Sequence, residues 1–142
     1  MLNENFKVTG QVTIQKNGEV VRDIPNTIVT AGKNNIASLI TDAGTKMTHM
    51  AVGTGTTSVA AGNTALVTET DRNALSTSGG TPSTNTIVYA AVWAAGDGTG
   101  ALTEAGLFSA SSGGTMMART VFSAVNKAAG DILTITWTVT IS

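Results

Sequence analysis

The segment Leu133–Ser142, LTITWTVTIS, is the clearest guide to the architecture, because apolar and polar residues alternate along its whole length. The apolar positions are Leu133, Ile135, Trp137, Val139 and Ile141, and the polar positions are Thr134, Thr136, Thr138, Thr140 and Ser142. Successive side chains of a strand point to opposite faces, so the pattern predicts one long strand whose apolar face lies in a core. We expect the threonine face to lie against solvent or another subunit, which makes Thr134, Thr136, Thr138 and Thr140 candidate interface residues.

An N-terminal hairpin is predicted over residues 6–25. Alternating apolar residues lead to Asn17-Gly18, a dipeptide typical of tight two-residue turns in which both residues have φ > 0. Pro25 marks the end of the return strand or an edge position, since proline cannot donate to a strand ladder.

A second hairpin is predicted over residues 102–125, with a turn of two serines and two glycines. If this turn centres between Ser112 and Gly113, Gly106 lies opposite Arg119, and Glu104 is the diagonal neighbour of Arg119 on the same face. We therefore expect Glu104 and Arg119 to form a structural pair, with the arginine stem lying over the bare backbone of Gly106.

One segment has helical spacing. Ile36, Leu39 and Ile40 predict a short α-helix over about residues 32–43, with Thr30 as a plausible N-cap and Gly44 as the stop. The remaining segments, with glycine-rich turns between them, have the spacing of all-β proteins. The predicted fold class is mainly β: a single β-sandwich domain over residues 1–142, with about seven or eight antiparallel strands and the helix lying across it.

The composition argues against several classes of function. The net charge is −1 and only 12% of residues are charged, which argues against binding to nucleic acid or to anionic membranes. No cysteine is present, so disulfides and thiolate metal sites are excluded. The first ten residues lack a signal-peptide core, and no apolar run approaches the ~18 residues of a membrane span, so we expect cytoplasmic synthesis without a membrane anchor. Low charge also favours self-association.

Few residues could support catalysis. His49 is the single histidine, and the methionines around it favour a structural role over metal binding. Glu69 and Asp71 are two residues apart, which predicts one strand face; we interpret them as a solvated pair partly neutralised by Arg72 rather than the carboxylate pair of a glycosidase.

Two other features have structural interpretations. The glycine-rich segment Gly53–Thr57 lacks the lysine of a phosphate-binding loop and predicts a tight turn. Trp93 and Trp137 lie on predicted strands and are expected in the core. We therefore expect no enzymatic activity, no cofactor and no required metal.

Residues 101–142 resemble a recurrent module of tailed-bacteriophage virion proteins. The motif T-E-x-G-L-F corresponds to Thr103, Glu104, Gly106, Leu107 and Phe108, and A-R-x-x-F corresponds to Ala118, Arg119 and Phe122. A K-x-x-x-D link at Lys127 and Asp131 then leads to L-T-I-T-W at residues 133–137. The segments Asn26–Ile40 and His49–Thr57 also resemble the helix and glycine turn that precede this module, so the resemblance covers most of the chain from Asn26 onward.

The resemblance implies a non-enzymatic structural protein of the virion, made in the host bacterial cytoplasm. Similar small β-proteins coat phage heads as cement or decoration proteins, which implies the major capsid protein as a partner and a homo-oligomer, with a trimer favoured. The module also occurs in tail-fibre and collar proteins, so the alternative is a tail-fibre, collar or baseplate component involved in attachment to the host, with tail proteins as partners. A carbohydrate-binding module or hydrolase would need an exposed aromatic platform or a carboxylate pair in a cleft.

Overall fold

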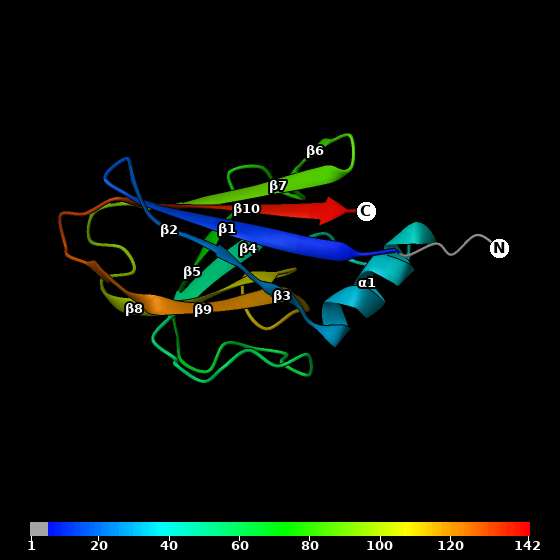
Figure 1. Cartoon of the computed structure of the whole chain (residues 1–142), viewed down its shortest axis with the longest axis horizontal. Coiled ribbons are helices and arrows are strands. Elements are labelled where there is room, and N and C mark those ends of the chain that lie inside the picture. The colour runs from blue at the N-terminus through cyan, green and yellow to red at the C-terminus, as the bar shows by residue number, and fades with distance from the viewer. Residues whose placement is uncertain (1–5) are drawn as a thin grey trace.

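The computed structural model describes residues 6–142 and contains two antiparallel five-stranded sheets that face each other, with one helix (Figure 1). The predicted fold class, a mainly β sandwich with a short helix, is confirmed. Sheet A has the order β2-β1-β10-β7-β6 and contains β1 (Val8–Lys16), β2 (Glu19–Pro25), β6 (Thr81–Ser83), β7 (Thr86–Trp93) and β10 (Leu133–Ile141). Sheet B has the order β3-β9-β8-β4-β5 and contains β3 (Thr27–Ile28), β4 (His49–Gly53), β5 (Glu69–Ala74), β8 (Gly100–Phe108) and β9 (Met116–Lys127).

Strand β10 lies in the middle of sheet A, paired with β1 on one side and β7 on the other. Its apolar face fills the core: Trp137 and Ile135 are completely buried, and only Ile141 at the end is partly exposed. A one-residue slip would move this apolar set to the outer face, so the core fixes the register. The prediction for the apolar face of the terminal strand is confirmed.

The N-terminal hairpin is also confirmed. Asn17 has φ 53° and Gly18 has φ 84°, which is the pair of positive angles expected for the tight turn. The return strand β2 is an edge strand of sheet A and ends at Pro25. The missing N–H of the proline therefore removes no hydrogen bond between central strands.

The sandwich has ten strands among the described residues, more than predicted. Strand β3 has two residues and β6 has three, which is too short for an alternating pattern to be recognised. Strands β6 and β7 form a hairpin, because the chain reverses between them at Thr84, whose φ is 55°.

The helix α1 runs from Thr30 to Ile40 rather than over residues 32–43. Val29 is the N-cap residue and makes no side-chain cap hydrogen bond, so the prediction of Thr30 as the cap was wrong. The N–H of Thr30 is instead satisfied by the carbonyl of Ala61 in a distant loop. At the other end Asp42, with φ 59°, takes the left-handed conformation expected for a residue after a helix, in place of Gly44.

The position of α1 also differs from the prediction. The helix covers one open end of the sandwich instead of lying across a sheet face (Figure 1). It approaches β9 closely at Gly32, where a Cβ atom would lie 2.2 Å from the carbonyl oxygen of Met117. Within residues 6–142 no helix has the length and hydropathy needed to cross a bilayer.

Candidate functional site

The second hairpin, formed by β8 and β9, has the predicted register. Gly106 lies opposite Arg119, and Glu104 lies opposite Val121, which places Glu104 and Arg119 on one face. The guanidinium of Arg119 donates from Nη2 to Glu104 Oε2 at 2.8 Å and from Nε to the same oxygen at 3.0 Å. Both residues are 0% exposed, so the expected pair is a fully buried ion pair.

The carboxylate of Glu104 also accepts hydrogen bonds from three backbone N–H groups of a distant loop. Oε1 accepts from Gly55 at 3.0 Å and from Thr68 at 2.7 Å, and Oε2 accepts from Val67 at 3.0 Å. Burial opposes the charged form, but these N–H groups and Arg119 outweigh it and hold the pKa of Glu104 below its usual range. The group is therefore a charged carboxylate whose oxygens are occupied by internal donors.

Arg119 bonds to the same loop with its remaining N–H groups. Nη1 donates to Asn63 Oδ1 at 3.1 Å and Nη2 donates to the carbonyl of Thr57 at 3.0 Å. The ion pair thus fastens residues 54–68, here called the covering loop, onto the outer face of sheet B (Figure 1). Beneath the covering loop is a small second core, which consists of Val29, Ala51, Leu66, Phe108 and Met116.

Glycines permit this close approach. A Cβ atom on Gly53 or Gly55 would lie 2.6 or 2.5 Å from Glu104 Oε1, so the glycine-rich segment is shaped to receive an internal carboxylate rather than a phosphate. The space above Gly106 is taken by Leu66 and Phe108, whose atoms would each be 3.0 Å from an added Cβ. Leu66 of the covering loop and Phe108 of β8 thus supply the nearest packing there, and the expected contact with the arginine stem stays a prediction.

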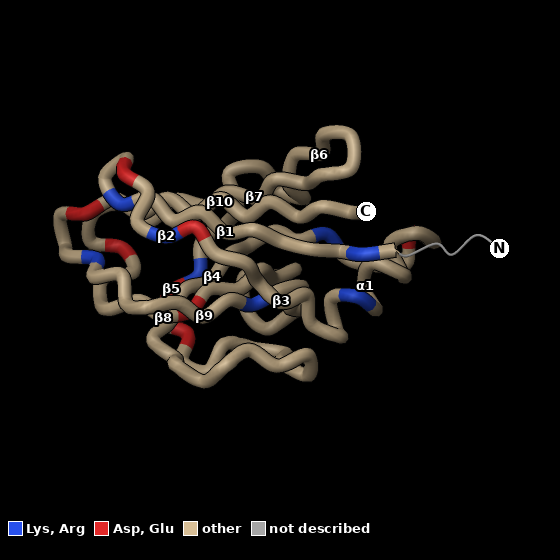
Figure 2. The backbone as a smooth tube through the Cα atoms, viewed as in Figure 1, with Lys and Arg blue, Asp and Glu red and all other residues tan. Residues whose placement is uncertain are grey.

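The outer face of sheet A contrasts with that of sheet B. Thr134, Thr136, Thr138 and Thr140 all point outward and are half-buried. In the sheet register, Thr136 lies between Thr13 and Ala90, and Thr138 lies between Gln11 and Val88. Strands β6, β7 and β10 contain no charged residue, so this face, here called the threonine face, is uncharged across three adjacent strands (Figure 2).

The two carboxylates of β5 do not share a face, contrary to the prediction. A register shift between β4 and β5 leaves Thr70 as an extra residue between Glu69 and Asp71. Glu69 therefore pairs with Arg72 at 2.7 Å, as expected for a partly neutralised charge.

Asp71 turns toward sheet A instead. Its pKa is raised first by burial and then by the charge of Asp97 in the loop after β7. Beside it, the indole Nε1 of Trp93 and one oxygen of Asp71 are buried without a hydrogen-bond partner of good geometry. This cluster was missed from the sequence, because Asp71 lies on β5 and Asp97 lies in the loop between β7 and β8, 26 positions away (97 − 71).

The single histidine, His49, lies on β4. His49 Nδ1 is 2.8 Å from the hydroxyl of its neighbour Thr48. In the part of the chain that the structure describes, no three His, Cys, Asp or Glu side chains gather in a way that could hold a metal ion. Trp93 and Trp137 are 0% exposed and belong to the core, as predicted.

Comparisons with known proteins assign no family to the chain. No protein-family model matches the chain, and no curated protein or solved structure shows significant similarity to it.

Proposed function

We propose that this chain is a non-enzymatic structural protein of a tailed-bacteriophage virion, and specifically a capsid cement (decoration) protein that binds and stabilises the assembled head. The motifs that carry the resemblance are structurally important in this chain. Glu104, Arg119, Phe108 and Trp137 are all at most 1% exposed, and the first two hold the covering loop. This supports the proposal, because residues that hold the core and the covering loop together are the ones that a fold module would need to keep.

The observation that carries the proposal is the difference between the two sheet faces. Sheet B is covered on its outside by the covering loop, whereas the threonine face of sheet A is open and has no charge on β6, β7 or β10. A flat, uncharged, β-branched surface can pack on another protein with little desolvation cost and can still satisfy its hydroxyls there. The threonine face is therefore the proposed contact surface with the major capsid protein.

Stabilisation follows from mass action in this proposal. A protein that binds only the assembled head lowers the free energy of that state and leaves the free subunits unaffected. Many copies, each with modest affinity, add their contributions over the shell. Such a protein needs a rigid contact face, and strand β10 of the threonine face is paired on both sides, with β1 and with β7.

The alternative is a tail-fibre, collar or baseplate component that takes part in attachment, since the resembled module occurs in such proteins too. Copy number separates the two. We expect mass spectrometry of purified virions to find this chain in numbers comparable with the major capsid protein. A few copies per particle would instead favour the tail.

Carbohydrate binding is the weakest candidate. An aromatic platform for a sugar ring must be exposed, yet five of the six aromatic side chains (three Phe, two Trp, one Tyr) are at most 8% exposed. Only Phe6, at 70%, is accessible.

A binding experiment tests the proposed contact surface directly. Purified protein is mixed with heads that lack it, and bound protein is measured after sedimentation. We expect Thr136→Arg with Thr138→Arg to abolish binding, because both arginines would be trapped against the capsid, while the melting temperature stays near that of the wild type. Thr56→Arg, at an exposed position of the covering loop, is the matched control and should bind normally. Undiminished binding of the double variant would rule out the threonine face.

A further inference from the structure

One end of the molecule carries an open apolar groove of about 550 Å³, here called the groove end. It lies between the chain that enters β1 and the outer side of α1, and its apolar lining is Phe6, Val8, Ile36, Ala37 and Ile40. Phe6 is 70% exposed and Ile40 is 81% exposed, so large apolar side chains stand in solvent on both sides of the groove. Exposed apolar patches of this extent commonly mark interaction sites in soluble proteins.

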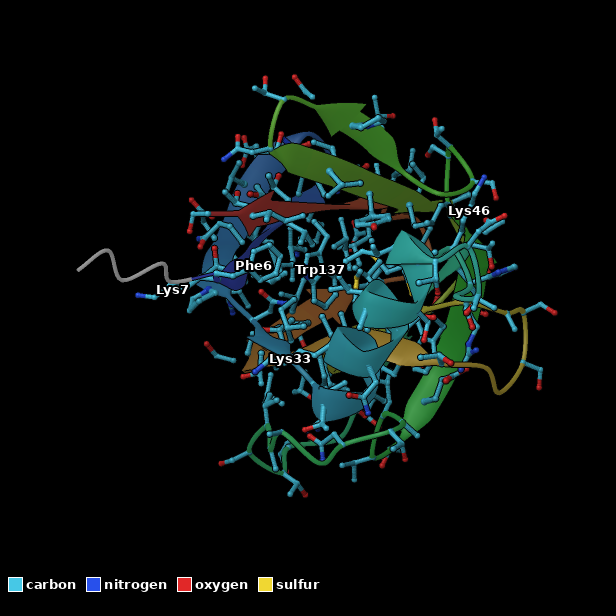
Figure 3. All side chains as sticks on the ribbon, turned by 90° about the vertical axis from the view of Figure 1, so that its right-hand side faces the viewer. Phe6, Lys7, Lys33, Lys46 and Trp137 are labelled. Carbon is cyan, nitrogen blue, oxygen red and sulfur yellow. The ribbon has the colours of Figure 1, made fainter. Side chains whose placement is uncertain are left out.

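Lysines surround the groove end. Lys7 and Lys33 line the groove itself. Figure 3 shows Phe6 and Lys7 on one side of α1 and Lys46 on the other. The segment between α1 and β4 adds one acidic residue, Asp42. The side chains here thus combine an apolar groove with an excess of positive charge.

The opposite end, here called the turn end, has the complementary character. The β1–β2 and β9–β10 turns lie side by side, because the N–H of Asn17 donates to the carbonyl of Ile132 at 2.8 Å and the N–H of Ile132 donates to Asn17 Oδ1 at 2.9 Å. Val20 is 57% exposed and Ile132 is 49% exposed. Each follows an acidic residue, Glu19 or Asp131.

The carboxylates of Glu19 and Asp131 are at least partly exposed at the turn end, whereas Lys127 is buried and Lys16 is partly exposed. Both ammonium groups keep their charge and donate to the carbonyls of Asn126 and Ala94, and both act on the carboxylate of Asp131. Asp131 is held in its charged form, since the Asn17 amide and the Ala128 N–H lower the pKa of its carboxyl. Protruding apolar side chains therefore stand beside carboxylates at one end, and an apolar groove stands beside lysines at the other.

We infer that the turn end of one copy docks into the groove end of the next, so that the chain self-associates head to tail. The exposed valine and isoleucine of the turn end fill the groove, and the carboxylates beside them face the lysines. A second copy supplies both the apolar surface and the opposite charge that the groove end lacks. The inference goes beyond the proposed function, because it concerns contacts between copies and needs no capsid.

Such an interface is heterologous, because two different patches of the same chain meet. It closes into a ring if the rotation between copies permits and otherwise extends as a filament. The contact uses the two ends of the sandwich and leaves the threonine face free for another partner.

Complementation between two variants tests the inference. The groove variant carries Lys33→Glu and Ile40→Asp, and the turn variant carries Glu19→Gln and Ile132→Asp, so the two changed patches do not attract each other. All four positions are at least partly exposed, so folding is expected to survive, and thermal denaturation checks this. Lys33→Glu alone and Ile132→Asp alone serve in place of an unstable double variant. Thr56→Asp, at an exposed position of the covering loop, is the control.

Sedimentation velocity and native mass spectrometry over a concentration series measure the result. We expect the wild type and the control to oligomerise, and each variant alone to associate roughly 100-fold more weakly or worse. An equimolar mixture of the two variants should form dimers with one copy of each and nothing larger, because the mixture holds only one intact groove–turn combination. A monomeric wild type, variants that assemble normally, or a mixture without mixed dimers would overturn the inference. The last outcome, together with loss of assembly in Thr136→Arg, would assign self-association to the threonine face.

Discussion

Glu104 and Arg119 are 2.8 Å apart at their closest atoms, are fully buried, and bind backbone groups at both ends of the covering loop. A buried ion pair is costly to form, because both charges leave water. It persists here because internal donors bind both oxygens of Glu104, and internal acceptors bind four of the five N–H groups of Arg119. The pair therefore holds the covering loop on the sheet. Its removal should also loosen residues 54–68, which are far from Glu104 and Arg119 in the sequence.

The first prediction concerns the energy of this pair. Arg119→Met leaves a buried carboxylate without its counter-ion, and Glu104→Gln leaves a buried guanidinium, so each should lower the free energy of unfolding by ~3–5 kcal/mol. A double-mutant cycle measured by urea denaturation should show strong coupling. Glu69→Gln, which breaks the more exposed pair with Arg72, is the comparison and should cost at most about 1 kcal/mol. Zero coupling would refute the fastening role.

The second prediction concerns the glycine that receives Glu104. In Gly55→Ala the new Cβ would lie 2.5 Å from Glu104 Oε1, so the covering loop must shift and its hydrogen bonds must weaken. We expect a clear loss of stability and faster amide hydrogen exchange in residues 54–68. Gly62→Ala is a matched control in the same loop, because no atom lies within 4 Å of its added Cβ. Equal exchange in the two variants would contradict the proposed geometry.

The third prediction concerns the N-terminal turn. Gly18 has φ 84°, which a β-branched residue resists, so Gly18→Val should be clearly destabilising although no atom lies within 4 Å of the added Cβ. Gly130→Val is the control: Gly130 has equally open space, but its φ is not in the left-handed region. Thermal denaturation should separate the two variants. Equal melting temperatures would mean that backbone conformation does not limit this turn.

The fourth prediction concerns acid. The folded pKa of Glu104 is lowered, so its contribution to stability is fully present above the unfolded value, about 4.3, and is lost as the pH falls through the folded pKa. The wild type should therefore lose stability on acidification more steeply than Glu104→Gln does. Parallel curves below pH ~4 would show that other carboxylates govern acid unfolding.

Asp71 should behave in the opposite way, which is the fifth prediction. Burial and the charge of Asp97 raise the folded pKa of Asp71, so its contribution is fully present below the unfolded value, about 3.9, and is lost as the pH rises through the folded pKa. Asp71→Asn should thus make the protein more stable at neutral pH and reduce the change in stability between neutral and mildly acidic buffer. An unchanged pH profile would show that neither burial nor the charge of Asp97 raises the pKa of Asp71.

Local preferences were enough to predict several elements. The alternation of Leu133–Ile141 specifies a strand because side-chain direction in a strand depends only on parity. The Asn17-Gly18 turn follows from the steric freedom of those two residues. The register of Glu104 and Arg119 follows from the length of a single turn, since the two strands of a hairpin are joined directly. Each of these depends on residues that are close in the sequence.

Long-range packing accounts for the rest. The carboxylate of Glu104 binds N–H groups 36, 37 and 49 positions away, and no local pattern identifies such partners. The bulge at Thr70 that separates Glu69 from Asp71 arises from pairing with β4, which the alternation of β5 alone does not reveal. The helix lies over the end of the sandwich because Gly32 admits the backbone of β9, and the Ala61 carbonyl supplies its missing cap. These contacts are made by backbone groups and by the close fit of packed surfaces. Both depend only weakly on residue type, so a single sequence does not reveal them.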